Sequence, residues 1–485
     1  MTASSEQLRT REIFVGGHFE ASSSTKSYDA VNPTTEEVMA ALAESTAEDL
    51  DRAVAAGRAA QPGWAGAPWQ KRAQTLRRFA EALDERAEEF AALDVADSGN
   101  PIGAMRDDVA GGIQELRFYT GLAPEVKGHT QPASDSTLTF TERTAYGVVG
   151  RLIPYNHPFK AAVGKIAAPL AAGNAVILKP SEHCSLSALE MAKVAAEILP
   201  AGLLSVLTGS GAQVGAGLVG HPDVPRISFT GSVPSGRAVL RGAAECIKHV
   251  TVELGGKNPF IVFPDVDVAR AARAAVRGMN LARSSGQSCQ STSRIFVHRQ
   301  VHDAFVDELL SVVDGLRVGD PRDESVDLGP MSFRGHYDRV LAAIDAGRRE
   351  GARLLCGGGR PEDLDRGYFV APTVFDDVQD GMTIATDEIF GPVMSILTWD
   401  DVDDVVRRAN HSQYGLTANI WSNDISQALR AARRVESGYV FVNSPGKRPL
   451  GSPFGGWKAS GLGKGSSLEE LLSYTREKAV TVELG

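Results

Sequence analysis

The feature that most constrains the fold of this chain is a regular alternation of short β-branched runs with helix-like stretches beyond Tyr146. The strand-like runs occupy residues 147–153, 175–178, 203–207, 226–229 and 250–254. The helix-like stretches between them cover residues 159–171, 184–198, 211–220 and 233–245. Such alternation is typical of a parallel sheet whose strands are joined by crossover helices, so an α/β fold is predicted.

A second series of strand-like runs follows Glu253. Its members are residues 260–263, 294–298, 373–375, 393–398 and 439–443. The series predicts a second α/β domain of about 200 residues, and a chain of 485 residues is long enough for both domains. Ahead of the alternation, residues 1–45 suggest hairpins, whereas residues 47–95 and 105–120 have helical periodicity.

Two further segments alternate strictly between apolar and polar residues. Residues 125–145 suit an exposed strand pair, and Ala479–Leu484 forms an alternating run at the end of the chain. This last run has no partner nearby in the sequence, and unpaired strand edges are usually covered in proteins. We therefore expect it to add to the sheet of another subunit, which predicts a homodimer or homotetramer.

Composition narrows the range of partners and compartments. With 50 Lys and Arg against 60 Asp and Glu, the formal net charge of −10 argues against binding to nucleic acid or to an anionic membrane. The longest apolar stretch, Ile166–Leu178, is shorter than the ~20 residues of a membrane helix, and no secretory signal is visible. Four cysteines without metal-ligand spacing favour a cytoplasmic protein with no bound metal.

Three polar residues stand out as candidates for chemistry. Cys289 lies in a polar, glycine-containing stretch, a context that suits either a nucleophilic thiol or a structural cysteine. Glu253 follows apolar strand residues and precedes two glycines, a position that suits either a general base or a solvent-facing edge residue. Asn156 lies in a loop bracketed by prolines, so its amide either stabilises an oxyanion or satisfies its own turn.

Two glycine clusters follow predicted strands and precede predicted helices. Gly209–Gly215 resembles a dinucleotide fingerprint only superficially, because no acidic residue follows about 20 positions later. In Phe229–Gly236, backbone N–H groups and the Ser232 hydroxyl suit a phosphate at a helix N-terminus. Lys179 and Glu182 follow another strand and suit the hydroxyls of a ribose.

Taken together, these segments resemble the NAD(P)-dependent aldehyde dehydrogenase superfamily over about residues 10–480. The resemblance rests on eight stretches that occur in the order found in the family. They are Ile153-Pro-Tyr-Asn-His-Pro158, Lys179-Pro-Ser-Glu182, Phe229-Thr-Gly-Ser232, Glu253-Leu-Gly-Gly-Lys257, Gly286-Gln-Ser-Cys289, Glu388-Ile-Phe-Gly-Pro-Val393, Tyr414-Gly-Leu416 and Pro453-Phe-Gly-Gly-Trp-Lys458.

The resemblance implies NAD-dependent oxidation of an aldehyde to a carboxylic acid through a cysteine thiohemiacetal and thioester. Cys289 is then the nucleophile and Glu253 the general base, while Asn156 and the Cys289 backbone N–H form the oxyanion hole. The residues implied to contact the cofactor are Ile153, Pro154, Tyr155, Lys179, Ser181, Glu182, Phe229, Thr230, Gly231, Ser232, Leu254, Gly255, Glu388 and Phe390. Glu182 at the ribose favours NAD over NADP, because its carboxylate repels a 2′-phosphate.

The family fold implies a Rossmann-like cofactor domain, a second α/β catalytic domain and a β-strand arm that joins subunits. The expected cofactor domain comprises residues 1–126 and 146–252, and the catalytic domain comprises residues 253–455. The oligomerisation arm is expected at residues 127–145 and 470–485.

Departures from the family pattern bear on the substrate. Tyr155, His157 and Ser284 replace commoner residues near the reacting groups, and Gly465 stands where many members have a glutamate. Arg283, six positions before the nucleophile, is where semialdehyde oxidisers of the family commonly hold a substrate carboxylate. The adjoining Lys447-Arg448 pair adds positive charge in the loop that usually borders the substrate tunnel.

Other readings of the same residues stay open. Arg283 instead pairs with an acidic residue or faces solvent, and the pocket takes neutral aldehydes against a wall of Tyr155 and Phe159, with Phe454 as a further contact. The reaction is alternatively acyl transfer to coenzyme A or thiol ester hydrolysis. Acylating relatives generally lack a glutamate at position 253. The remaining alternative is a non-catalytic structural protein on the same scaffold.

Overall fold

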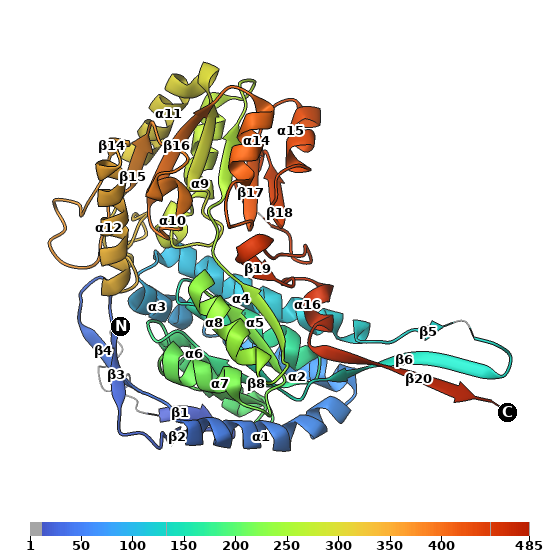
Figure 1. Ribbon diagram of the computed structural model, residues 1–485. Helices are drawn as coiled ribbons and strands as arrows, with labels where there is room; N and C mark the ends of the chain where they lie inside the picture. Colours follow the sequence, from blue (N-terminus) through green and yellow to red (C-terminus); the bar gives the residue numbers. More distant parts are fainter. Residues whose placement is uncertain (1–11, 132, 447, 485) are drawn as a thin grey trace.

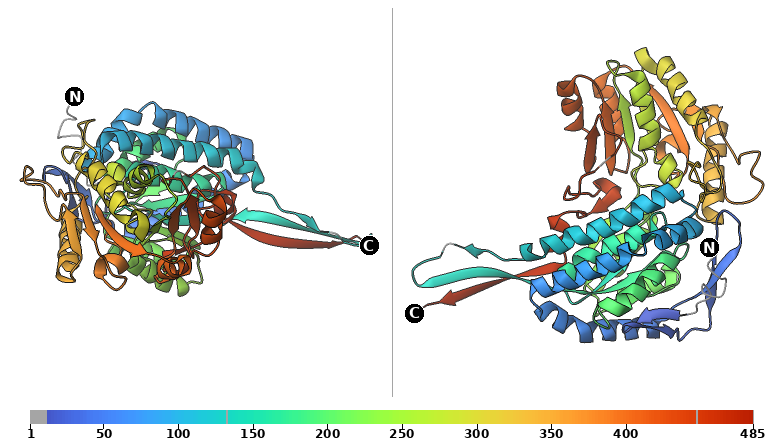
Figure 2. Two further views of the ribbon diagram at one scale, coloured as in Figure 1. Left: turned by 90° about the horizontal axis from the view of Figure 1, so that it is seen from above. Right: turned by 180° about the vertical axis from the view of Figure 1, so that it is seen from behind.

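The computed structural model describes residues 12–131, 133–446 and 448–484. Two α/β bodies are stacked on one another, and a slender arm projects from the one formed mainly by the first half of the chain (Figure 1). The same arrangement is seen from above and from behind in Figure 2. The fold is thus mixed α/β, as the strand–helix alternation predicts.

The first body contains a sheet that, within the described residues, has the strand order β19-β11-β10-β7-β8-β9-β1-β2. Its five central strands are parallel and confirm the first predicted series: β7 (Val148–Leu152), β8 (Ala175–Lys179), β9 (Leu204–Val206), β10 (Arg226–Thr230) and β11 (His249–Glu253). The antiparallel edge strands are β1 (Glu12–Val15), β2 (His18–Ala21) and β19 (Gly461–Leu462). A separate hairpin pairs β3 (Ser27–Val31) with β4 (Val38–Ala43).

The direction of winding reverses at β7. From β7 the chain moves outward through β8 to β9, and it then returns to the other side of β7 for β10 and β11. Because such crossovers are right-handed, the helices of the two halves cover opposite faces of the sheet. The first half contributes α5 (Pro158–Ala171) and α6 (Leu186–Ile198), and the second contributes the π-helical turn η2 (Gly211–Gly215), α7 (Ala216–Gly220) and α8 (Val233–Ala244). Ligands of such sheets bind beyond the carboxyl ends of the strands at this reversal.

Four helices lie between β4 and the parallel strands in the sequence and pack outside the sheet. They are α1 (Ala47–Gly66), α2 (Trp69–Asp84), α3 (Ala87–Ser98) and α4 (Ile102–Leu122), followed by the short turn η1 (Ala123–Glu125). Two buried carboxylates of α3 accept backbone N–H groups at the start of later helices. Asp94 binds the N–H of Phe159 in α5 at 2.9 Å, and Asp97 binds that of Leu186 in α6 at 3.0 Å. Helix α3 therefore holds the beginnings of the two helices that follow β7 and β8.

The second body contains a sheet whose order is β14-β15-β16-β13-β12-β17-β18 within the described chain. Its strands are β12 (Pro259–Val262), β13 (Arg294–His298), β14 (Arg353–Cys356), β15 (Thr373–Asp376), β16 (Val393–Trp399), β17 (Thr417–Trp421) and β18 (Tyr439–Val442). The strands predicted after Glu253 are confirmed, but β14 and β17 were not anticipated. All pairs are parallel except β14 with β15.

The helices of the second body cover its sheet and link its strands. They are α9 (Val268–Gly278), α10 (Leu281–Ser284), η3 (Arg299–Val301), α11 (His302–Asp314), α12 (Arg334–Arg349), α13 (Thr383–Thr386), α14 (Val402–Asn410) and α15 (Ile425–Ala432). Alanine and valine positions of α9 are buried against the sheet, and Asp267 caps its N-terminus by accepting the N–H of Arg270. After β18 the chain returns to the first body through η4 (Lys458–Ser460) and α16 (Leu468–Leu472).

The projecting arm is a sheet of β5 (Thr130–Gln131), β6 (Thr137–Ala145) and β20 (Thr475–Glu483). Strand β20 pairs antiparallel with β6 over its whole length, from Thr475 opposite Ala145 to Glu483 opposite Thr137. The last strand thus has no partner nearby in the sequence, as expected, but it does have one in its own chain, and its addition to the sheet of another subunit stays a prediction. Pairing across more than 300 residues of sequence was not visible locally, and the outer edge of β20 is unpaired within the described residues.

A buried charged cluster joins the arm to the first body. The Glu470 carboxylate accepts hydrogen bonds from Tyr119 Oη at 2.5 Å and from the Ser466 N–H at 2.7 Å, and it pairs with Arg151 at 3.3 Å. A Cβ at Gly465 would lie only 3.3 Å from Glu470 Oε2. The departure at Gly465 thus has a structural reason, because a carboxylate from five residues further along fills the adjoining space. Within the described residues, none of the helices is both long and apolar enough to cross a bilayer.

Candidate active site

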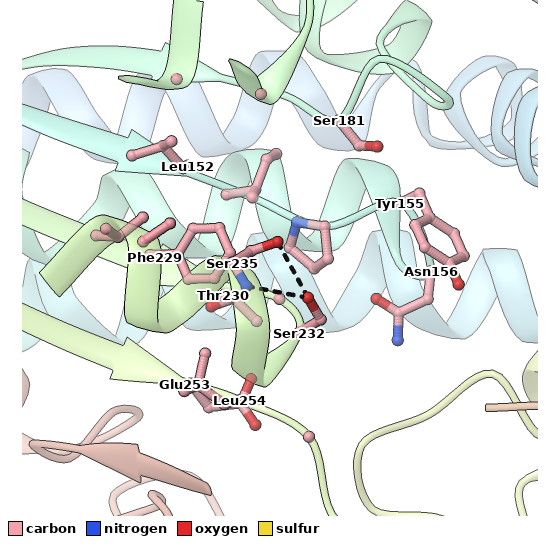
Figure 3. A pocket seen from close by; sticks show the side chains of 18 of the residues that line it. Leu152, Tyr155, Asn156, Ser181, Phe229, Thr230, Ser232, Ser235, Glu253 and Leu254 are labelled. Carbon is pink, nitrogen blue, oxygen red and sulfur yellow. Dashed lines mark hydrogen bonds between the residues drawn. The ribbon is translucent and has the colours of Figure 1, made fainter. Parts of the chain in front are cut away.

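The residues expected to carry catalysis and to hold the cofactor line one cavity of about 740 Å³. They follow the carboxyl ends of neighbouring strands of the first sheet, with Ile153–Asn156 after β7, Lys179 at the end of β8, Ser232 after β10 and Glu253 at the end of β11. Figure 3 shows Tyr155, Asn156, Ser232 and Glu253 around this cavity. Reversal of the winding at β7 opens the crevice, and the second body closes it with Cys289, Glu388 and Phe390.

The three candidate catalytic residues come from separate segments. Asn156 is 5% exposed, and its Nδ2 donates to the backbone carbonyl of Gln287 at 2.8 Å. Cys289 lies in the loop between α10 and β13. Its thiol interacts with the carboxylate of Glu253, and each of the two groups shifts the pKa of the other. The candidate nucleophile, base and amide donor are therefore brought together where the two bodies meet.

Burial and neighbouring charges set the ionisation of this group. Burial raises the pKa of the Cys289 thiol, and the adjacent Glu253 carboxylate raises it further. Burial also raises the pKa of Glu253 above its ordinary value of 4.5. Glu253 Oε1 is buried and has no hydrogen-bond partner among the described residues. A carboxylate of raised pKa beside a neutral thiol is suited to accept its proton.

The loop that carries the thiol is held by residues that sequence reasoning missed. Asn258 donates from Nδ2 to the carbonyls of Cys289 and Ser291, at 2.7 and 2.9 Å, and its Oδ1 accepts the N–H of Thr417 at 3.0 Å. A Cβ at Gly256 would lie 2.7 Å from the Cys289 carbonyl oxygen, so only glycine permits this approach. Both residues lie within five positions of Glu253. This closeness in sequence to a candidate catalytic residue was the only feature that could have indicated their role.

The other half of the cavity suits a dinucleotide. Ser232 caps the N-terminus of α8 by accepting the N–H of Ser235, and this positive helix end opens into the cavity. Lys179 Nζ lies 3.1 Å from Glu182 Oε2. Small apolar residues of α7 and α8 line this part of the cavity and suit contact with an adenine ring. They are Ala216, Val219, Ala238, Val239 and Gly242. The Gly211–Gly215 cluster, which resembles a dinucleotide fingerprint only superficially, also lines this part of the cavity.

Glu388 connects the two halves. Its Oε1 accepts the N–H of Gly256 at 2.9 Å, and burial raises its pKa to about 7. A Cβ at Gly255 would lie 1.8 Å from Glu388 Oε2, so this glycine allows the carboxylate to approach the chain. A buried carboxylate in this position suits the hydroxyls of a second ribose.

Helix α12 supplies two cavity residues that the sequence did not reveal, His336 and Arg339. His336 Nε2 donates to the carbonyl of Phe390 at 2.7 Å, while Arg339 donates to His336 Nδ1 at 3.3 Å. Burial lowers the pKa of His336 to about 4, so the ring is neutral. Tyr155 packs edge-on against Phe333, 5.1 Å between ring centroids, in the same aromatic group.

The residues expected to contact the substrate lie differently. Arg283 is ion-paired, with Nη2 2.6 Å from Asp108 Oδ1 and Nη1 3.8 Å from Asp107. Phe159 is 0% exposed and packs on Phe90 in the core, so it does not form the stacking wall that the sequence suggested. The physical reason is that α5 turns this side chain away from the loop and toward α3.

The remaining two substrate expectations concern the loop after β18. Phe454 is 8% exposed, and the guanidinium of Arg448 lies over its ring at 3.9 Å. Lys447 lies outside the described residues. Within the described part of the chain, no group of three or more His, Cys, Asp or Glu side chains is arranged to hold a metal ion.

Known proteins share this architecture. The model of the aldehyde dehydrogenase family matches residues 19–480. The NAD+ complex of an aldehyde dehydrogenase from Bacillus cereus is 36% identical, with a TM-score of 0.95 over 100% of this chain and 99% of that one. Betaine aldehyde dehydrogenase from Staphylococcus aureus, also in complex with NAD+, is 30% identical, with a TM-score of 0.96 over 99% and 97%. The chain therefore belongs to the aldehyde dehydrogenase family, oxidoreductases that act on the aldehyde group.

Proposed function

We propose that this aldehyde dehydrogenase converts an aldehyde to its carboxylic acid with NAD, through a thiohemiacetal and then a thioester on Cys289. The observation that carries the proposal is the meeting of Cys289, Glu253 and Asn156 on one cavity, whose other half suits a dinucleotide. NAD+ in two solved structures of the family, at 30% and 36% identity, supports the choice of cofactor.

The first step is attack of Cys289 on the aldehyde carbonyl. Glu253 takes the thiol proton, sulfur forms a bond to the carbonyl carbon, and the carbonyl electron pair moves onto oxygen. Asn156 uses one amide hydrogen to bind the Gln287 carbonyl, so its second is free for the oxyanion. The backbone N–H of Cys289 is the other donor to this oxygen.

The second half of the reaction releases the acid. When bound, NAD supplies the acceptor for the hydride that leaves the former aldehyde carbon. Glu253 first releases to solvent the proton that it took from the thiol, and it then accepts a proton from a water molecule, which attacks the thioester and displaces the Cys289 thiolate. Glu253 Oε1, which has no partner among the described residues, is the oxygen placed to orient that water.

Preference for NAD over NADP is proposed from Glu182. Lys179 neutralises part of its charge, yet a 2′-phosphate would still face the carboxylate at close range. The two hydroxyls of an unmodified ribose would bind both side chains instead. The preference is tested by comparing kcat/KM for the two cofactors.

The proposed substrate class is an aldehyde that also bears a carboxylate, either an aliphatic semialdehyde or a carboxylated aromatic aldehyde. Three basic side chains gather around one buried carboxylate that lies outside the residues lining the cavity. His157, Lys160 and Arg283 surround the buried Asp108 with contacts of 2.5, 3.0 and 2.6 Å. Asp107, 3.8 Å from Arg283 Nη1, is a second carboxylate, so with a neutral histidine Lys160 and Arg283 are balanced in charge within this cluster. Neutral aldehydes are the competing class.

One assay separates the proposed reaction from its alternatives. NADH formation from an aldehyde panel without coenzyme A supports hydrolytic oxidation, whereas a strict requirement for coenzyme A supports acyl transfer. Hydrolysis of a thiol ester without NADH formation supports an esterase. If none of these three activities is detected, the remaining alternative is a non-catalytic protein with this fold.

Assembly into a homodimer or homotetramer is proposed from the arm. Strand β20 presents an unpaired edge within the described residues, and Val482 and Leu484 are exposed on it at 38% and 59%. Removal of residues 475–485 should shift the mass measured by light scattering toward the monomer. The four cysteines are free thiols, which suits the proposed cytoplasmic location.

A further inference from the structure

Arg448 differs from the other arginine considered for substrate binding in having no acidic partner. Arg283 is paired with Asp108 at 2.6 Å, so binding a substrate carboxylate there would compete with an existing ion pair. Arg448 forms no ion pair within the part of the chain that the structure describes. Among the described residues its one hydrogen bond is a long one of 3.5 Å, from Nη2 to Ser466 Oγ.

The guanidinium of Arg448 is nonetheless held in place. Its carbon lies 3.9 Å from the centroid of the Phe454 ring, close enough for a strong cation–π contact. Nη1 is buried and has no hydrogen-bond partner among the described residues. An N–H donor kept away from water without an acceptor is costly, so such a group normally has a partner when the protein works.

The positive charge of Arg448 also acts on the two proposed catalytic groups. Burial raises the pKa of both Glu253 and Cys289, and the positive charge of Arg448 opposes that rise in each of them. Ser466, which Arg448 contacts, follows Gly465, whose carbonyl accepts the Phe454 N–H at 3.0 Å. These two contacts tie the loop that bears Arg448 to residues 465 and 466.

We propose that Arg448, held on the ring of Phe454, is the residue that binds the carboxylate of the aldehyde substrate. This inference rests on the proposed function and assigns the recognition of the acid group to Arg448 instead of Arg283. A planar guanidinium binds a carboxylate through two parallel N–H···O bonds, which also sets the distance from the acid group to the reacting carbonyl. The buried Nη1 then gains the acceptor that it lacks.

The test compares matched aldehydes with and without a carboxylate. We would measure kcat/KM with NAD for succinic semialdehyde against butanal, and for 2-carboxybenzaldehyde against benzaldehyde. Arg448→Gln should lower kcat/KM for the charged member of the preferred pair on the order of 10–100-fold, mainly through KM. The uncharged member should change by less than about 3-fold, and Arg448→Lys should restore part of the loss because it keeps the charge.

Two further variants make the result specific. Arg476 also lies over an aromatic ring, 4.9 Å from the Tyr146 centroid, but in the arm, so Arg476→Gln controls for loss of an arginine–aromatic contact. Arg283→Ala should leave the ratio of charged to uncharged aldehyde unchanged. Equal NAD binding by wild type and Arg448→Gln, measured from intrinsic fluorescence, shows that the variant is folded.

Each other outcome overturns the inference. A wild-type enzyme that prefers the uncharged member of both pairs, or an Arg448→Gln variant that affects both members equally, removes Arg448 as the carboxylate ligand while the proposed reaction stands. Loss of the preference in Arg283→Ala, but not in Arg448→Gln, returns the role to Arg283. Absence of NADH with every aldehyde removes the proposed function and this inference together.

Discussion

The side-chain amide of Asn156 is tied to the loop of the nucleophile, because its Nδ2 donates to the carbonyl of Gln287 at 2.8 Å. Its own backbone carbonyl accepts Asn100 Nδ2 at 2.9 Å. Asn156 is thus held on one side by the segment of Gln287 and on the other by that of Asn100. A donor that is already oriented pays little reorganisation cost when an oxyanion forms.

Asn156→Ala should therefore lower kcat by roughly 10²–10³, the usual cost of losing one oxyanion donor. Because the side chain lies at the catalytic end of the cavity, the dissociation constant for NAD should change little. Steady-state kinetics and a fluorescence titration measure the two effects. Near-normal turnover of the variant would remove Asn156 from the oxyanion hole.

Cys289→Ala should abolish NADH formation, because no other cysteine lines the described cavity. Binding of NAD should persist, since the cofactor half of the cavity is untouched. Cys356→Ala is the matched control, because that partly buried thiol lies in β14 of the second body. Activity that survives in Cys289→Ala would contradict the assignment of the nucleophile.

The pH dependence of turnover should follow Glu253. A general base acts only when deprotonated, and burial raises its pKa above 4.5, so kcat should fall as the pH is lowered through a value higher than that of an exposed glutamate. In Glu253→Gln, hydrolysis of the thioester should be slowed most, leaving a burst of about one NADH per active site without steady turnover. Stopped-flow absorbance measures the burst. Steady turnover at the wild-type rate would show that another group activates the water.

Glu182→Gln should shift the preference toward NADP. Loss of the carboxylate removes a like-charge contact with the 2′-phosphate, which costs several kcal/mol in a close pair, so kcat/KM for NADP should rise by about 10-fold or more. For NAD, kcat/KM should fall because one ribose ligand is weakened. A wild-type enzyme with equal kcat/KM for both cofactors would refute the role of this residue.

Glu470→Gln should destabilise the fold, because it leaves Arg151 buried without its counter-charge. Breaking a buried ion pair costs about 3–5 kcal/mol of the free energy of unfolding, which urea denaturation monitors. Glu469→Gln, at the exposed neighbouring position, is the control and should have little effect.

The same cluster predicts loss of stability in acid. Burial acts to raise the pKa of Glu470, but the charges of Lys165 and Arg151 prevail and lower it to about 2. The unfolded chain then binds a proton near pH 4.5, before the folded protein does. Stability from this group is complete above pH 4.5 and is lost as the pH falls toward 2. An equal acid transition in wild type and Glu470→Gln would contradict this account.

Local patterns predicted the elements that are contiguous in sequence. The parallel strands of the first sheet and most of the second were read from β-branched runs, and the residues at their carboxyl ends were expected to be functional. Strands β14 and β17 escaped because their sequences, such as Thr417-Ala-Asn-Ile-Trp421, lack a distinctive β-branched run. In that sheet their pairing depends on neighbours far away in the chain.

Contacts between segments that are far apart in the chain could not be predicted from local sequence patterns. Whether Arg283 is free depends on Asp108, which comes from α4 and lies 175 residues earlier in the chain. His336 and Arg339 reach the cavity only because α12 of the second body packs over the first. Phe159 follows the catalytic loop in sequence, yet the turn of α5 directs it into the core.

By itself, the sequence determined the α/β class and the two series of strands, because these follow from short-range periodicity. The motifs that resemble the family indicated the candidate catalytic and cofactor residues, but not the cavity residues of α12. Only the tertiary structure decided that the last strand pairs with β6, that Glu470 fills the space beside Gly465, and that Arg448 instead of Arg283 lacks a counter-ion. The physical reason is that charge pairing and strand pairing depend on distance in space. One sequence without its fold contains no measure of that distance.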